Sequence, residues 1–217
     1  MTGDLFENLP DVNPQRVSLG DGAILLRGFA KEADSALLRA VNEVIVQAPL
    51  RHLVTPGGYR MSVSMSCCGR LGWVSDRSGY RYDPIDPASG RAWPSMPAVF
   101  IELARSAASQ AGFENFDPDA CLINCYEPGA RLSLHQDRHE RDVVAPIVSV
   151  SLGLPAVFLF GGMQRSDRPQ RYRLAHGDVA VWGGPARFTF HGIAPLADGQ
   201  HPMLGRRRIN VTFRKVL

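Results

Sequence analysis

The sequence is nearly devoid of lysine. Only Lys31 and Lys215 are lysines among its 24 basic residues, so arginine supplies almost all of the positive charge. The net charge of +3 and a pI near 8.8 are compatible with an anionic partner but do not require one. Arginine suits phosphate contacts because its planar guanidinium binds pairs of oxygens. An arginine-favouring codon bias explains the excess equally well, so charge alone assigns no partner.

Long apolar runs are also missing. No stretch approaches the roughly 20 residues that a membrane-spanning helix needs, and the N-terminus has no basic-then-apolar signal pattern. We therefore expect no membrane partner and a cytoplasmic location. The four cysteines, Cys67, Cys68, Cys121 and Cys125, lack the spacing of a disulfide framework. Adjacent cysteines rarely bind one zinc ion together, so reduced, partly buried thiols are predicted instead.

The chain has the size and the pattern of one domain built mainly of strands. Its 217 residues, 45% of them hydrophobic, are enough for one core. Residues 1–22 are turn-rich and predict an irregular arm, followed by a short strand at 23–26. Apolar residues at helical spacing predict two helices, the first capped by Asp34 or Ser35 and the second by Ser95. Short strands separated by turns then favour an antiparallel barrel or jelly roll: 120–126, 146–153, 156–160, 171–174, 178–182, 186–191 and 207–214.

Two histidines and an aspartate form a candidate metal site. His135 and Asp137 are two residues apart, so on an extended segment both side chains lie on one face. With His191 they would complete the two-histidine, one-carboxylate set of non-haem Fe(II) oxygenases, which leaves positions free for a cosubstrate and O2. Such a short spacing also recurs by chance, and a surface histidine in an Asp- and Arg-rich loop is the alternative.

A second polar pattern lies near the C-terminus. On a strand, Arg208, Asn210, Thr212 and Arg214 share one face, while Ile209 and its apolar neighbours share the other. Two arginines flanking an amide and a hydroxyl suit a small dianion, since guanidinium groups bind carboxylates bidentately. An edge strand that carries charges against aggregation is the alternative.

These motifs resemble the AlkB family of Fe(II)- and 2-oxoglutarate-dependent dioxygenases, which demethylate alkylated nucleobases. The resemblance rests on His-Gln-Asp at 135–137, Phe-His-Gly at 190–192 and Arg-x-Asn-x-Thr-Phe-Arg at 208–214. It extends through segments 55–59, 71–73, 84–87, 119–124, 145–155 and 176–178. It implies a mainly β (α+β) fold, a cupin-like double-stranded β-helix or jelly roll. The implied parts are an N-terminal arm and supporting helix (1–49), a nucleotide-recognition lid (50–92) and the dioxygenase core (93–217).

The resemblance also implies roles for individual residues. His135, Asp137 and His191 would bind Fe(II). The 2-oxoglutarate pocket would comprise Asn124, Cys125, Tyr126, Arg208, Asn210, Thr212 and Arg214, with Arg208 pairing with the distal carboxylate. Without the resemblance, a tyrosine satisfied inside a barrel is the preferred interpretation of Tyr126. The base would be contacted by Met61, Trp73, Tyr80, Arg81, Tyr82, Arg138, His139 and Arg165, with Trp73 stacked on it.

The sequence departs from the family pattern after His-Gln-Asp. A basic residue and then an aspartate are expected there, and the chain has Arg138 and His139. The family places that carboxylate against the damaged base, so the preference of this chain among bases is open. Arg165 matches an arginine that the family places near the base. Ile209 stands where relatives carry a tyrosine.

The remaining histidines are expected to be structural or exposed. His176 falls in a turn between strands, and His52 and His201 have no partners nearby in the sequence. Asp178 and Trp182 are hypothesised to support the site from behind its ligands.

The implied activity is oxidative demethylation of 1-methyladenine and 3-methylcytosine in single-stranded DNA, with RNA left open. The protein would act as a monomer and release formaldehyde, succinate and CO2. One alternative is the same iron chemistry on a protein or small molecule, which leaves Trp73 and Tyr80 unexplained. The other is a non-catalytic nucleic-acid-binding jelly roll, against which the intact metal triad argues.

Overall fold

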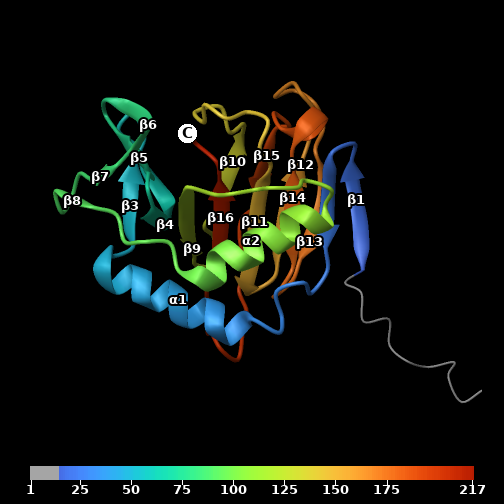
Figure 1. The fold of residues 1–217 in the computed structure, drawn as a ribbon, viewed down its shortest axis with the longest axis horizontal. Helices are drawn as coiled ribbons and strands as arrows, with labels where there is room; N and C mark the ends of the chain where they lie inside the picture. The colour runs from blue at the N-terminus through green and yellow to red at the C-terminus, as the bar shows by residue number, and fades with distance from the viewer. Residues whose placement is uncertain (1–14) are drawn as a thin grey trace, which may run out of the picture.

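The computed structural model describes residues 15–217, in which most antiparallel strands belong to two sheets that pack face to face (Figure 1). The larger sheet is formed, in spatial order, by β1 (Arg16–Gly20), β2 (Ala23–Leu26), β14 (Val179–Trp182), β11 (Ile147–Gly153), β16 (Arg208–Arg214), β9 (Ala120–Tyr126), β4 (Arg60–Gly69) and β3 (Arg51–Val54). The smaller sheet is formed by β10 (Leu132–His135), β15 (His191–Ile193), β12 (Ala156–Phe160) and β13 (Gln170–Leu174). This architecture confirms the predicted jelly roll.

Two helices cover the outer face of the larger sheet. α1 (Asp34–Gln47) and α2 (Ala98–Gln110) lie side by side across the strands (Figure 1). Leu37, Val41 and Val44 are buried on α1 at helical spacing, as expected for one apolar stripe. On α2, Phe100 is fully buried and meets Phe213 of β16 edge to face at 5.7 Å. Each such burial contributes about 1.5–3 kcal/mol of transfer free energy, so the helices fix this face of the sheet.

Strand β16 divides its side chains between two environments. Ile209, Val211 and Phe213 pack into the core beneath the helices. Arg208, Asn210, Thr212 and Arg214 point the opposite way, into the space between the sheets. The period of two that predicted this division is a consequence of the pleated backbone.

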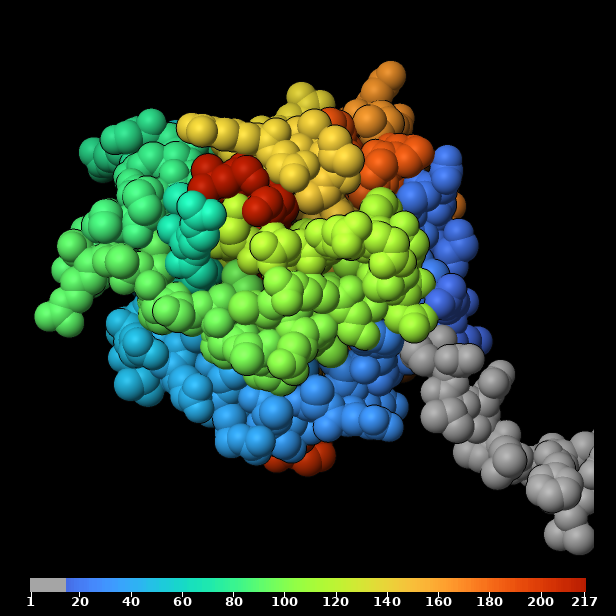
Figure 2. All heavy atoms as spheres, in the orientation of Figure 1, coloured from blue at the N-terminus to red at the C-terminus, as the bar shows by residue number. Residues whose placement is uncertain are grey.

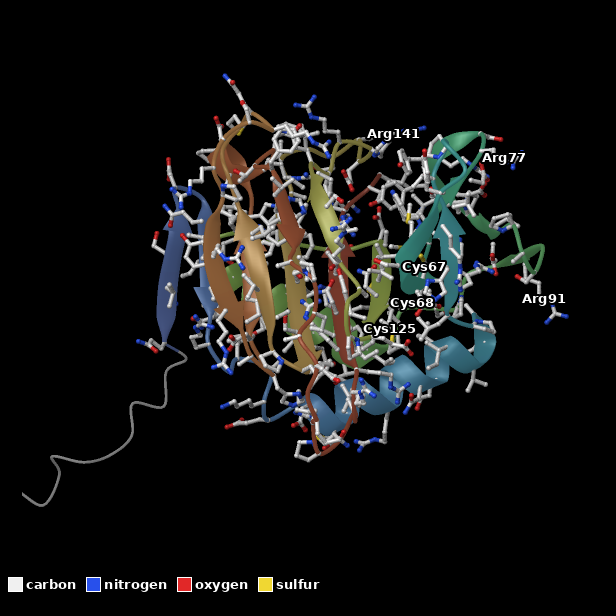
Figure 3. The ribbon with its side chains drawn as sticks, turned by 180° about the vertical axis from the view of Figure 1, so that it is seen from behind. Cys67, Cys68, Arg77, Arg91, Cys125 and Arg141 are labelled. Atoms are coloured by element: carbon white, nitrogen blue, oxygen red, sulfur yellow. The ribbon has the colours of Figure 1, made fainter. Side chains whose placement is uncertain are left out.

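Two hairpins belong to neither sheet and lie at one end of the molecule, where the first packs against the larger sheet (Figure 1). They are β5 (Gly72–Asp76) with β6 (Gly79–Asp83), and β7 (Ile85–Asp86) with β8 (Arg91–Ala92). Figure 3 shows Arg77 at the turn of the first hairpin and Arg91 toward the tip of the second. The short extended pieces predicted between residues 50 and 92 are therefore present, and β3 and β4 of this segment extend the larger sheet.

Several local predictions were wrong. Residues 16–20 of the predicted irregular arm form strand β1, and the rest of that arm up to residue 14 lies outside the described residues. Neither helix has a side-chain cap: α1 follows Ala33 and α2 follows Pro97, whose extended backbone delays the helix beyond Ser95. The predicted strand 186–191 is instead a short 3-10 helix, Gly184–Ala186, followed by β15.

The cysteines behave as predicted. All four lie among the described residues as free, buried thiols, and burial raises the pKa of Cys67 to about 12. Figure 3 places Cys67, Cys68 and Cys125 in the interior of the molecule. Within residues 15–217, no helix combines the length and the apolar composition needed to cross a bilayer.

Candidate metal and cosubstrate site

The three predicted metal ligands meet at the end of the smaller sheet. β10 ends at His135 and pairs with β15, and this register places His135 opposite His191, with ring centroids 4.4 Å apart. Asp137 follows β10, and its carboxylate oxygens lie 3.8 Å from Nε2 of each histidine. The three ligand atoms lie within 4.8 Å of one another. Because metal–ligand bonds are about 2 Å long, one ion can bind all three side chains with small adjustments.

Backbone carbonyls orient both histidines. Nδ1 of His135 donates to Ser133 O at 2.9 Å, and Nδ1 of His191 donates to Thr189 O at 2.9 Å. These hydrogen bonds place the proton on Nδ1 and leave Nε2 of each ring as the metal-binding atom. Burial, reinforced by the charge of His135, lowers the pKa of His191 to about 3. The His191 ring is therefore neutral and able to bind a cation at neutral pH.

The aspartate is held ionised by an arginine. Arg214 donates to Asp137 Oδ2 from Nε at 3.2 Å and from Nη2 at 2.9 Å. Burial opposes ionisation of Asp137, but the charge of Arg214 and its hydrogen bonds outweigh that effect and hold the pKa of Asp137 well below its usual range. A carboxylate that remains charged is ready to bind a cation.

A cavity of about 780 Å³ opens in front of the triad, lined by both sheets and the β5–β6 hairpin. Five buried polar atoms of cavity-lining residues have no hydrogen-bond partner in residues 15–217: Asn124 Oδ1, Tyr126 Oη, Trp182 Nε1, and Arg208 Nε and Nη1. Each unpaired buried polar group costs about 1–3 kcal/mol, so such groups are rare without a ligand or water. Four of the five atoms can donate, which suits an anionic ligand.

Aromatic side chains form the wall of the cavity on the hairpin side. Trp73 and Tyr80 stack at 5.6 Å with an interplanar angle of 17°, and Tyr80 meets His139 edge to face at 5.9 Å. Met61 and Arg165 line the same cavity. A flat, partly apolar ligand such as a base can stack on this wall while its substituent points toward the triad.

Comparisons with known proteins bear directly on this site. The model of the 2OG-Fe(II) oxygenase superfamily matches residues 22–214. The chain is 54% identical to the alpha-ketoglutarate-dependent dioxygenase AlkB of Escherichia coli, over 98% of this chain and 97% of that protein. The chain belongs to the AlkB family of 2-oxoglutarate- and Fe(II)-dependent oxygenases. An Arabidopsis thaliana AlkB-family relative named DNA N(6)-methyladenine demethylase ALKBH1C is 32% identical, over 73% of this chain and 41% of its own length. The solved structure of OsALKBH1 superposes with a TM-score of 0.82 at 28% identity, covering 93% of this chain and all of that one.

The residues of this AlkB-family chain fit Fe(II) and 2-oxoglutarate. The His-Asp-His set offers the ligands that non-haem Fe(II) takes. Arg208 is buried, lies with its guanidinium 4.8 Å from the ring of Tyr126, and donates through Nη2 to Ser151 Oγ at 3.0 Å. Its free Nε and Nη1 and the Tyr126 hydroxyl are the donors that a carboxylate of the cosubstrate requires.

Asn210 lines the cavity, as expected, and also joins the residues around it. Its Oδ1 accepts hydrogen bonds from Asn124 Nδ2 at 3.1 Å and Thr212 Oγ1 at 3.0 Å. Its Nδ2 donates to Ser149 Oγ at 2.8 Å and Val150 O at 3.0 Å. The amide is saturated by these four contacts, so in this arrangement Asn210 aligns Asn124 and Thr212 along the cavity.

Three residues predicted to bind the cosubstrate or the base, Cys125, Arg81 and Arg138, do not line the cavity. On β9 the side chain of Cys125 points to the face opposite that of its neighbours Asn124 and Tyr126, and it packs in the core beneath the helices. Arg81 pairs with Asp76 at 2.9 Å and braces the hairpin. Arg138 lies over the ring of Phe188 at 5.8 Å. Asp178 accepts from the backbone N–H groups of Gly28 and Ala175 and fixes a turn, whereas Trp182 lies 4.8 Å from the His191 ring as hypothesised.

Sequence reasoning missed two buried charged residues beside the triad. Glu140 and Arg187 form an ion pair at 3.2 Å, and both side chains are 2% exposed. Arg187 also donates to Asp137 O at 2.9 Å and Ala145 O at 3.2 Å, which fixes the loop that carries Asp137. No pattern in the sequence distinguishes either residue from the exposed charges around it.

Proposed function

We propose that the protein removes methyl groups from N-methylated bases, including 1-methyladenine and 3-methylcytosine, in single-stranded DNA. When bound, Fe(II) with 2-oxoglutarate and O2 supplies the oxidant that hydroxylates the N-methyl group, yielding succinate and CO2. The hydroxymethyl product then loses formaldehyde and leaves the repaired base. The observation that carries the proposal is one cavity with the metal triad at one side and a stacked Trp73–Tyr80 wall at another.

The residues of this chain would act by binding and positioning. Trp73 and Tyr80 would stack on the base and turn its methyl group toward the triad. Arg208 and Tyr126 would hold the far end of the cosubstrate. No strong acid or base is required, since the reaction depends on orientation and on exclusion of water.

The hairpin that carries Trp73 and Tyr80, within residues 50–92, is proposed to be the nucleotide-recognition lid. The name of the Arabidopsis relative, a DNA demethylase, supports a nucleic acid as the substrate. Single strands are favoured because an unpaired base costs least to turn into the cavity. His139 lies at the hairpin wall, where it can contact the base.

The test is anaerobic reconstitution with Fe(II), followed by O2, 2-oxoglutarate and a single-stranded oligonucleotide that carries one methylated base. We expect the oligonucleotide to lose the mass of one methylene for each succinate formed. Asp137→Ala, which removes the carboxylate ligand, is the matched inactive control. Succinate without loss of mass would redirect the search to a protein or small-molecule substrate. RNA and duplex DNA with the same lesion would define the preferred strand.

We further propose that the protein is a cytoplasmic monomer. Four buried, free thiols suit a reducing compartment. Sedimentation at several concentrations, with and without oligonucleotide, tests the monomer.

A further inference from the structure

Glu140 lies at the centre of a buried cluster of charged groups beside the metal ligands. Its Oε1 accepts a hydrogen bond from the Tyr82 hydroxyl at 2.6 Å and faces Arg214 Nε at 3.3 Å. Its Oε2 accepts from Arg187 Nη2 at 3.2 Å. The cluster contains two carboxylates, Asp137 and Glu140, and two guanidinium groups, so its formal charges balance. A buried carboxylate needs such partners, because their charges and hydrogen bonds offset the free-energy cost of removing it from water.

The cluster forms a continuous path from the hairpin to a metal ligand. Tyr82 belongs to β6, and Arg214 carries the path on to Asp137 Oδ2 through Nη2 at 2.9 Å. Burial raises the pKa of Tyr82 well above its usual value, so the phenol keeps its proton and remains the donor.

Apolar and backbone contacts beside this path also join the hairpin to the metal-site loop. Tyr82 packs against the apolar cluster of Leu71, Ala120 and Val216. The carbonyl of Val216 accepts a hydrogen bond from the N–H of Arg141 at 2.9 Å. Figure 2 shows the C-terminal residues, in red, lodged between the hairpin and the loop that follows β10. Figure 3 shows Arg141 in that loop, at the same end of the molecule as Arg77. The hairpin, the C-terminal residues and the metal-site loop therefore contact one another here.

We propose that Glu140 is a positioning residue that joins the β5–β6 hairpin to the metal carboxylate. It holds Arg214 so that this guanidinium binds Oδ2 of Asp137, and through Tyr82 it anchors the hairpin. Since energetic coupling between two sites is reciprocal, cation binding at Asp137 and ordering of the hairpin stabilise each other. The proposal rests on the proposed function only in taking the hairpin as the element that binds the nucleotide.

The experiment measures hydrogen exchange of residues 72–83 in the full chain, with and without Mn(II), and the Mn(II) dissociation constant by titration. In the unsubstituted protein we expect Mn(II) to slow exchange in the hairpin. Glu140→Gln leaves two guanidinium groups facing one carboxylate. It should raise the dissociation constant about tenfold, as loss of a partner behind a metal ligand does, and should remove the effect of Mn(II) on the hairpin.

Tyr82→Phe separates the two halves of the proposal. It deletes only the hydroxyl that reaches Glu140, so the slowing of hairpin exchange by Mn(II) should be lost. Mn(II) affinity should fall only by the factor that this coupling contributes, and by less than in Glu140→Gln, because Glu140 still holds Arg214. Tyr172→Phe is the matched control, because it removes a tyrosine hydroxyl that donates to Gln170 at 2.7 Å on β13. It should change neither measurement.

The proposal is overturned if Glu140→Gln binds Mn(II) as the unsubstituted protein does, or if Tyr82→Phe retains Mn(II)-dependent slowing. If Glu140→Gln does not fold, the effect of Mn(II) on hairpin exchange in Tyr82→Phe tests the proposal by itself. Neither measurement involves turnover, so failure to demethylate oligonucleotides would refute the proposed function and leave this result unaffected.

Discussion

Arg208 provides the most direct quantitative test of the cosubstrate pocket. Its side chain is buried, and Nε and Nη1 have no acceptor among the described residues. Burial lowers its pKa, but a guanidinium is so strong a base that it stays charged at neutral pH. In Arg208→Met, a bound carboxylate loses its charged partner. Truncating one member of a buried charge pair costs about 2–5 kcal/mol. The dissociation constant for 2-oxoglutarate should therefore rise about 30-fold to 4000-fold.

The assay is thermal unfolding with Mn(II) in place of Fe(II), which prevents turnover. At 2-oxoglutarate of about 100 times its dissociation constant, binding stabilises the unsubstituted protein by about 2.7 kcal/mol. For a domain of this size, that free energy raises Tm by about 5–11 °C. At the same concentration, Arg208→Met should show a shift of less than about 4 °C.

The control for Arg208→Met is Arg207→Met, which removes an exposed arginine at the adjacent position and should keep the full shift. Mn(II) alone should stabilise all three proteins equally. A full 2-oxoglutarate shift in Arg208→Met would refute the assignment of this pocket.

Three further predictions concern the base, its identity and the core. Trp73→Ala should lower repair of a methylated oligonucleotide about 5-fold to 150-fold, which corresponds to the loss of one base–aromatic stacking interaction. The affinities for Mn(II) and 2-oxoglutarate should stay the same, and unchanged repair would show that Trp73 does not stack on the base. His139→Asp should change the ratio of 3-methylcytosine to 1-methyladenine repair in a competition assay. A ratio unchanged from that of the unsubstituted protein would show that position 139 does not contact the base. Phe213→Ala should lower the free energy of unfolding in urea by about 3–5 kcal/mol, because this ring is fully buried against Phe100; a loss below about 1 kcal/mol would contradict the described packing.

The sequence predicted best where structure follows from local geometry. Alternation along 208–214 placed Arg208 and Arg214 on the cavity face because pleating forces neighbouring side chains apart. The boundaries of β9 were correct because a run of apolar and small residues ends at Tyr126 beside a turn. The helices were also located correctly, since one buried stripe repeats at helical spacing.

The prediction that residues distant in sequence meet at the metal site came from the family resemblance and not from any local pattern. His191 reaches His135 only through the pairing of β10 with β15, and no feature near His191 specifies that register. Residues 186–191 show the same limit. A strand was predicted there, but the side chain of Arg187 turns inward and donates to the carbonyls of Asp137 and Ala145, and regular pairing begins only at His191. A partner from another segment decided the local conformation.

Asn210 and Glu140 show why sequence assigns residue types to a site better than it assigns their tasks. An amide between two arginines suggested a cosubstrate contact, but it gave no indication that Asn210 also makes four hydrogen bonds within the protein. Glu140 lies in a charged loop, and no sequence pattern indicates burial, yet its side chain is only 2% exposed. A buried carboxylate needs compensating charge, and Arg187 and Arg214 come from segments distant in sequence. The task of such a residue is therefore a property of the assembled cluster, which is why variants of Glu140 and Tyr82 should be compared in pairs rather than one at a time.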